Sequence, residues 1–374
     1  MNLNFDLLIT AGRIFLPDGL SNAPGAVAIV GDQIVAVGDH IIGDAKQKLD
    51  FPDGILLPGL VDLHAHPARS NSKFGVDPDR YLLPQGITTV MSQGDAGAST
   101  WDEYRRSTIE NSRTRVRLAL NVAACGEATD GPCCGDLSQL DVPAAIRAIE
   151  RSDGLIWGVA VNTSKPGCGE SDPREVLSRA VAIAEAAGKL LLFGMRDPRE
   201  WPFAEQMERL RPGDVVTYSY RKSPHNICET GRVDSAIRKA RERGILFDVC
   251  HGKASFSFEV AEQALADDFP PETISSDFYA AHLDANPQLT LPLHLSKLIA
   301  AGLDEPSAFQ AVTRRPSEIL GLAHEIGRLE GGRCADVCVL QYTEEPVTLV
   351  DVVGATRCGR VLETKCVVRA GLFV

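Results

Sequence analysis

Long apolar runs are missing from this sequence, and so is the basic, apolar start that marks a secretory signal. The first residues, Met1 to Asp6, lack both a positively charged segment and a long apolar core. No run is long enough to cross a bilayer as a helix. We therefore expect neither a signal peptide nor a membrane span, and we predict a cytoplasmic protein.

Basic residues are fewer than acidic residues in this chain. The 374 residues include 38 Lys and Arg against 50 Asp and Glu, which gives a formal net charge of −12. Nucleic acids and anionic membranes attract basic surfaces, so neither is an expected partner of this chain. The hydrophobic content of 44% is that of an ordinary globular protein, and the length suffices for one large domain and one small one.

Paired Cys-x-x-Cys motifs are also missing, although the chain has ten cysteines. Cytosolic cysteines are reduced by default. Those inside predicted strands, such as Cys250, Cys338 and Cys366, are expected to be mostly small buried residues.

Both ends of the chain are rich in short β-strand patterns. The predicted strands are 7–10, 25–30 and 33–37 near the start, and 335–340, 350–353 and 365–369 near the end. Gly31-Asp32 is a hairpin signal. Residues 1–56 and 325–374 are therefore predicted to form one small β-sandwich domain from both termini.

The middle of the chain, residues 57–324, alternates strand and helix patterns. Helices are predicted at 174–187, 233–243 and 258–267, and strands at 58–66, 87–92, 116–123, 155–161, 189–194, 214–220, 245–251 and 273–277. Eight such strands predict an α/β fold, a (β/α)8 TIM barrel. Reactive groups in this fold lie at the carboxyl ends of the strands. His64, His66, His251 and Asp277 all fall at such ends.

The tripeptide His64-Ala65-His66 is the most informative motif. It ends an apolar strand pattern that begins with a Pro58-Gly59 turn. Residues two apart on a strand point to the same side, so the two imidazoles would lie side by side as half of a metal site. Two histidines at this spacing can also occur by chance.

These motifs resemble the amidohydrolase superfamily, of the urease, dihydroorotase and cyclic-amidohydrolase kind. Within it, the chain is most similar to amidohydrolases or deacetylases near dihydroorotases and D-aminoacylases. The similarity covers nearly the whole length and is carried by segments 58–66, 86–90, 247–258, 274–277, 313–322, 327–329 and 332–337. The resemblance implies a barrel hydrolase with metal at the strand ends.

The chain departs from the two-metal pattern of that superfamily. The resemblance implies a carboxylated lysine on strand four and histidines on strands five and six, but those positions fall on Ala160, Phe193 and Tyr218. Alanine and phenylalanine have no lone pair to donate, and tyrosine is an uncommon zinc ligand. The ligands of one of the two metal ions are therefore expected to be missing.

His64, His66 and Asp277 remain as metal ligands. Two imidazoles and one carboxylate can hold one ion and leave a position open for water. Zinc is the expected ion, with another divalent metal as the alternative. Asp277 would also serve as the catalytic base. His251 is a second catalytic candidate, for contact with the substrate or as a fourth ligand, and a structural histidine is the competing interpretation.

Other side chains near the strand ends are candidates with weaker signals. Replacement ligands could come from Cys125, Cys133, Cys134, Cys168 or His225, although loop thiols and a surface histidine are the simpler interpretation. Substrate-binding residues are predicted to be Arg69, Arg196, Arg221, Tyr218 and His251. Arginines at one barrel mouth can clamp a carboxylate, so a carboxylate-bearing substrate is expected.

The leading hypothesis is a single-zinc hydrolase that cleaves a C–N bond in a small amide, cyclic imide or lactam. A deaminase is the alternative within the superfamily, and Phe193 counts against it. A non-hydrolytic binding relative is the alternative from another class. The expected partner is a small-molecule substrate, and the resemblance adds a possible homo-oligomer.

Overall fold

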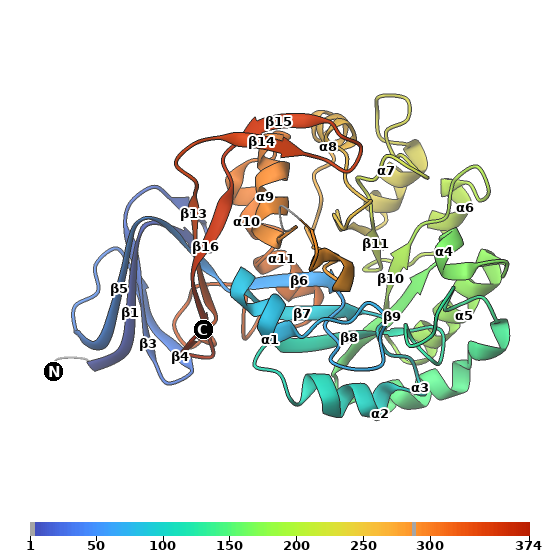
Figure 1. The fold of residues 1–374 in the computed structure, drawn as a ribbon, viewed down its shortest axis with the longest axis horizontal. Helices are drawn as coiled ribbons and strands as arrows, with labels where there is room; N and C mark the ends of the chain where they lie inside the picture. The colour runs from blue at the N-terminus through green and yellow to red at the C-terminus, as the bar shows by residue number, and fades with distance from the viewer. Residues whose placement is uncertain (1–3, 286–288) are drawn as a thin grey trace.

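The computed structural model describes residues 4–285 and 289–374, so residues 1–3 of the predicted terminal domain lie outside the described residues. Within the described part, a parallel seven-stranded sheet curls into the barrel on the right of Figure 1. Its strands follow one another in chain order, from β6 to β12. They are β6 (Leu60–Ala65), β7 (Ile87–Gln93), β8 (Arg115–Asn121), β9 (Ile156–Asn162), β10 (Leu190–Gly194), β11 (Val215–Thr217) and β12 (Leu246–Phe247).

The eighth barrel position is filled by an extended segment, residues 273–278, rather than by a regular strand. Isolated parallel bridges join Thr273 to Asp248 on one side and Phe278 to Ala65 on the other. The predicted strand 273–277 thus closes the barrel between the first and seventh strands without forming a continuous ladder. The TIM-like barrel class predicted from the alternation is confirmed.

Helices cover the outside of the barrel. α5 (Pro173–Ala186) shows why they form where they do: Asp172 caps the first turn by accepting from the Arg174 amide, and Val176, Ala180 and Ile183 bury one face against the strands. The other α-helices are α1 (Pro78–Tyr81), α2 (Trp101–Tyr104), α3 (Val142–Glu150), α4 (Lys165–Cys168), α6 (Phe203–Glu208), α7 (Ser235–Glu242), α8 (Phe258–Ala266), α9 (Leu291–Ala300), α10 (Glu305–Gln310) and α11 (Arg314–Ile319). Short 3-10 helices are η1 (Leu83–Gln85), η3 (Leu137–Gln139) and η4 (Ala280–His282), and η2 (Arg105–Ile109) is a π-helix.

Both termini contribute to one mixed sheet on the left of Figure 1. Its strands are β1 (Asn4–Leu16), β2 (Gly19–Ser21), β3 (Gly25–Val30), β4 (Gln33–Gly38), β5 (Asp44–Pro58), β13 (Val337–Tyr342), β16 (Leu362–Arg369) and β17 (Leu372–Phe373). The sheet curls around its own apolar core. An isolated bridge joins Gln33, the first residue of β4, to Cys334, which lies just before β13. The boundaries 1–56, 57–324 and 325–374 stay a prediction.

One predicted terminal strand is wrong. Residues 350–353 were expected to be extended, but β14 (Val347–Val350) ends there and a turn leads into β15 (Thr356–Gly359). Asp351 makes this turn, since its Oδ1 accepts from the amides of Val353 at 3.0 Å and Ala355 at 2.8 Å.

None of the helices in the described ranges is long and apolar enough to span a membrane.

Candidate metal centre

The histidine pair lies at the carboxyl end of β6, as its sequence position predicts. His64 is completely buried and His66 nearly so. The backbone of the closing segment pairs with them: the Asp277 amide donates to the His64 carbonyl at 2.7 Å, and the His66 amide donates to the Phe278 carbonyl at 2.9 Å. This pairing places Asp277 directly opposite the two imidazoles.

The three predicted ligands converge on one point. Asp277 Oδ1 lies 3.4 Å from His64 Nε2 and 3.5 Å from His66 Nε2. A tetrahedral zinc ion with bonds of about 2.0–2.1 Å separates its nitrogen and oxygen ligands by about 3.4 Å. The observed spacing therefore fits a divalent ion between these atoms. The Asp277 side chain is 13% exposed, so solvent reaches the centre from its side.

The outer nitrogen of each imidazole is held by a hydrogen bond. His66 Nδ1 lies 3.0 Å from Asp95 Oδ1, and the Asp95 carboxylate also accepts from the hydroxyls of Ser72 and Ser92, each at 2.6 Å. A carboxylate at Nδ1 fixes the ring with its proton outward and its Nε2 lone pair inward. The arrangement therefore orients His66 as a ligand.

His64 is held through a hydroxyl rather than directly. Its Nδ1 lies 3.0 Å from Thr217 Oγ1, and this hydroxyl donates to Asp248 Oδ2 at 3.0 Å. Asp62 fixes the backbone at His64, since its Oδ1 accepts from the amides of His64 and Ser276, each at 3.1 Å. Burial raises the pKa of Asp62 to about 7.

Sequence reasoning missed Asp95, Thr217 and Asp248. Asp95 follows the carboxyl end of the second barrel strand, and Asp248 stands in the predicted seventh strand two residues before Cys250. An acidic residue at a barrel strand's carboxyl end is a usable signal, because this edge carries the chemistry of such folds. Thr217 offered no comparable signal.

Charge interactions at the centre are strong in the metal-free protein. Burial by itself would lower the pKa of His66, but the carboxylates of Asp95 and Asp277 outweigh it and raise that pKa to about 10. Burial would likewise raise the pKa of Asp277, yet hydrogen bonds from His64 and His66 bring it below its ordinary value. Asp277 is therefore an ionised ligand at neutral pH.

Aromatic side chains surround the imidazoles. The Tyr218 hydroxyl lies 3.2 Å from His64 Nε2, which places this predicted substrate-binding residue beside the predicted metal position. Phe74 and Tyr279 pack on the His66 ring with centroids 5.1 and 6.1 Å away. Arg221 lies over the Tyr218 ring at 6.0 Å and is the predicted arginine that the structure brings to this wall.

The other two predicted arginines are engaged elsewhere. Arg69 pairs with Asp77 at 3.2 Å and with Asp79 at 2.8 Å. Arg196 Nε donates to Glu200 Oε2 at 2.6 Å, and the residue is nearly buried. Their guanidinium groups are therefore neutralised by carboxylates of the chain, and their role toward a substrate stays a prediction.

His251 belongs to a separate buried cluster. Its Nδ1 donates to the Gly252 carbonyl at 2.7 Å, its Nε2 lies 3.1 Å from Lys297 Nζ, and its ring stacks on His294 with centroids 3.8 Å apart. Both ring nitrogens thus have partners outside the His64 and His66 pair. The predicted catalytic contact of His251 stays a prediction.

Two of the three positions of the missing ligands, Ala160 and Phe193, carry no donor. Ala160 is buried in the apolar cluster that includes Leu192, its partner on β10. Phe193 instead packs in the larger core cluster, so Leu192 and Gly194 share the face of Ala160. Phe193 therefore faces away from Ala160, because side chains alternate along a strand.

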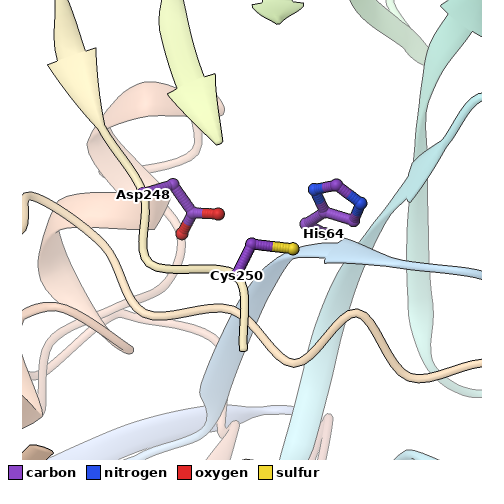
Figure 2. A group of neighbouring side chains, drawn as sticks. All are labelled: His64, Asp248 and Cys250. Atoms are coloured by element: carbon purple, nitrogen blue, oxygen red, sulfur yellow. The ribbon is translucent and has the colours of Figure 1, made fainter. Parts of the chain in front are cut away.

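Two groups of three potential ligands occur among residues 4–285 and 289–374. One is His64, His66 and Asp277; the other, which the sequence did not predict, is His64, Asp248 and Cys250. Figure 2 shows the second group, with Asp248 and Cys250 on the segment after β12 and the sulfur directed toward His64. Neither group includes Cys125, Cys133, Cys134, Cys168 or His225, which were the candidate replacement ligands.

The fold and the site together give a barrel whose first strand ends in a His-x-His pair, with an aspartate opposite the pair as a candidate metal ligand. Over nearly its whole length the chain is similar to members of the amidohydrolase superfamily. The curated relatives that it matches over most of both lengths include deacetylases, which are C–N hydrolases, and further curated relatives are adenine deaminases. No protein-family model matches the chain.

The relatives that match almost the whole chain include two deacetylases. A deacetylase of Enterococcus faecalis is 27% identical over 363 residues, which cover 96% of this chain and 95% of the relative. A deacetylase of Agrobacterium fabrum is 29% identical over 365 residues, which cover 96% and 89%.

Solved structures also match the fold over nearly the whole chain. A crystal structure of an adenine deaminase has a TM-score of 0.89 at 26% identity and covers 99% of both chains. A crystal structure of a dihydroorotase has a TM-score of 0.86 at 27% identity and covers 98% of both.

Proposed function

We propose that this protein is a deacetylase-like hydrolase with one zinc ion at His64, His66 and Asp277, acting on a C–N bond of a small amide. The observation that carries the proposal is the convergence of two Nε2 atoms on Asp277 Oδ1 at 3.4 and 3.5 Å. A divalent ion held there would polarise a substrate carbonyl and lower the pKa of water toward neutrality. The relatives named deacetylases support an N-acylated substrate.

The side chains around the centre would transfer the proton, stabilise the developing charge, exclude water and bind the substrate. Asp277 has Oδ2 free of the histidines, so this atom takes the proton of the attacking water and delivers it to the leaving nitrogen. The Tyr218 hydroxyl, 3.2 Å from His64 Nε2, donates a hydrogen bond to the carbonyl oxygen as negative charge develops there. Phe74 and Tyr279 exclude water from the His66 side. Arg221 would bind a substrate carboxylate.

The test is release of acetate from N-acetylated small amines and amino acids by zinc-loaded protein, followed in a coupled assay. Cyclic imides and lactams form the second substrate panel. His66→Ala should lower kcat/KM by more than about 100-fold, because it removes one ligand of the ion. Arg199→Ala is the matched control on an exposed residue and should leave the rate unchanged. An unchanged rate in His66→Ala would refute the assignment.

A deaminase is the second candidate, favoured by the adenine deaminase structure with a TM-score of 0.89. It would release ammonia from an aminopurine rather than acetate from an amide. Ammonia release from adenine by the same zinc-loaded protein, without acetate release from any amide, would favour this candidate over the deacetylase.

A further inference from the structure

We propose that His64, Asp248 and Cys250 form a second metal site that selects a thiophilic divalent ion and shares His64 with the first. One potential ligand atom from each residue lies within 4.8 Å of the other two, and all three side chains are completely buried. Imidazole, carboxylate and thiolate together are a mixed donor set suited to zinc. The inference goes beyond the proposed hydrolysis and needs no substrate.

The backbone directs the Cys250 thiol into this position. Cys250 has φ of 44°, in the left-handed region that favours glycine. The flanking amides fix the conformation, since Val249 donates to the Thr273 carbonyl at 3.0 Å and His251 donates to the Ser275 carbonyl at 3.1 Å. A cysteine held in a conformation that favours glycine is strained, and such strain is found at functional positions.

Asp248 is a buried carboxylate that is held by hydroxyl groups. Its oxygens accept from the hydroxyls of Thr273 at 2.8 Å, Ser275 at 2.5 Å and Thr217 at 3.0 Å. No Lys or Arg nitrogen of the described chain lies within 4.0 Å of it. Among residues 4–285 and 289–374, Oδ1 accepts only from Thr273, so it keeps a second lone pair. A buried carboxylate in these surroundings gains from a cation.

His64 joins the two sites through opposite edges of its ring. Its Nε2 faces Asp277, whereas its Nδ1 faces Thr217 and, through that hydroxyl, Asp248. An ion at the second site takes Nδ1 in place of the Thr217 contact. One ring can serve two ions only after losing both its protons, so the second ion should bind more weakly than the first.

Cobalt(II) is the probe, because a thiolate bound to it gives a charge-transfer band in the near ultraviolet. Titration of the metal-free full chain should produce this band in the wild type and in His66→Ala, which keeps the second site. Cys250→Ser should bind fewer ions and lose the band. Cys250→Gly suits the local backbone, so it keeps the test valid if the serine variant does not fold. Cys228→Ser, at another buried cysteine, is the matched control and should keep the band.

Three outcomes would overturn the second site. They are cobalt bound without a thiolate band, a band that persists in Cys250→Gly, and no cobalt bound at all. Cobalt bound without the band, and lost in His66→Ala, would refute the second site and leave the proposed hydrolase centre standing. Asp248→Asn adds a readout of affinity, which should fall at least about tenfold for the ion that gives the band.

Discussion

Asp95 contacts the Nδ1 atom of His66, and Thr217 contacts the Nδ1 atom of His64. These two contacts determine the direction in which each imidazole points its Nε2 atom. Both Nε2 atoms face Asp277 without any further adjustment of side chains. The ligands are thus preorganised, and their geometry depends on residues that do not themselves contact the ion.

The Asp95→Asn variant tests that dependence. It keeps the shape of the side chain but removes the charge that orients His66, so we expect zinc affinity to fall about 10–100-fold. Competition with a chromophoric chelator measures the change. Asp102→Asn, on an exposed aspartate, is the control and should have wild-type affinity. Equal affinities in the two variants would contradict a role for Asp95.

Zinc affinity should also depend on pH through His66. In the metal-free protein its pKa is raised to about 10, so the ring is protonated at neutral pH. Binding needs the neutral ring and therefore releases one proton, whereas Asp277 is already ionised. Affinity should rise about tenfold per pH unit between about pH 7 and 9. Isothermal titration in buffers of different ionisation enthalpy counts the proton, and a pH-independent affinity would contradict the assignment.

At the residue scale, the sequence predicted His64, His66 and Asp277 as neighbours because strand ends of a barrel meet at one edge. It could not predict their hydrogen-bond partners, since Thr217 and Asp248 come from different strands and depend on register. The partners of Arg69 and Arg196 were hidden for the same reason: local carboxylates, such as Asp79 and Glu200, reach them first.

At the scale of elements, the seventh strand shows where alternation fails as a guide. The pattern predicted a strand over 245–251, but β12 covers only Leu246–Phe247. Beyond it the backbone turns into left-handed conformations at Cys250 and Gly252. These turns bring Cys250 to His64 and Gly252 to Asp277, and nothing in hydrophobic periodicity encodes them.

Gly252 is a position where a small substitution should disturb the metal centre. It has φ of +49°, and a Cβ there would lie 2.5 Å from Asp277 Oδ2. Gly252→Ala should therefore destabilise the fold by about 1–3 kcal/mol and displace Asp277 from its ligand position. Thermal unfolding and zinc content measure the two effects. Gly38→Ala has open space around its Cβ and should change neither. Wild-type zinc content in Gly252→Ala would contradict this account.

At the scale of the whole molecule, a nearly buried ion pair joins the terminal segments to the barrel at the strand ends opposite the metal centre. Arg115, the first residue of β8, pairs with Asp336 at 2.8 Å and with Glu325, and Arg369 of β16 pairs with Asp336 at 3.0 Å. Arg115 lies at the amino end of its strand, the end of such barrels that serves stability rather than chemistry.

Asp336→Ala should separate stability from function. It leaves the nearly buried Arg115 without its main partner and should lower the free energy of unfolding by about 3–5 kcal/mol. Zinc content per folded chain should stay at the wild-type value, because the metal centre lies at the opposite strand ends. Denaturant unfolding and elemental analysis measure the two quantities. Loss of zinc from the folded variant would contradict the separation.

The most direct measurement is the zinc content per chain, by elemental mass spectrometry after zinc loading and dialysis, of the wild type and of a His66→Ala, Asp277→Asn double variant. The account predicts that the wild type retains one more ion per chain than the double variant. Equal contents in the two proteins, or no ion in the wild type, would contradict a metal centre at His64, His66 and Asp277.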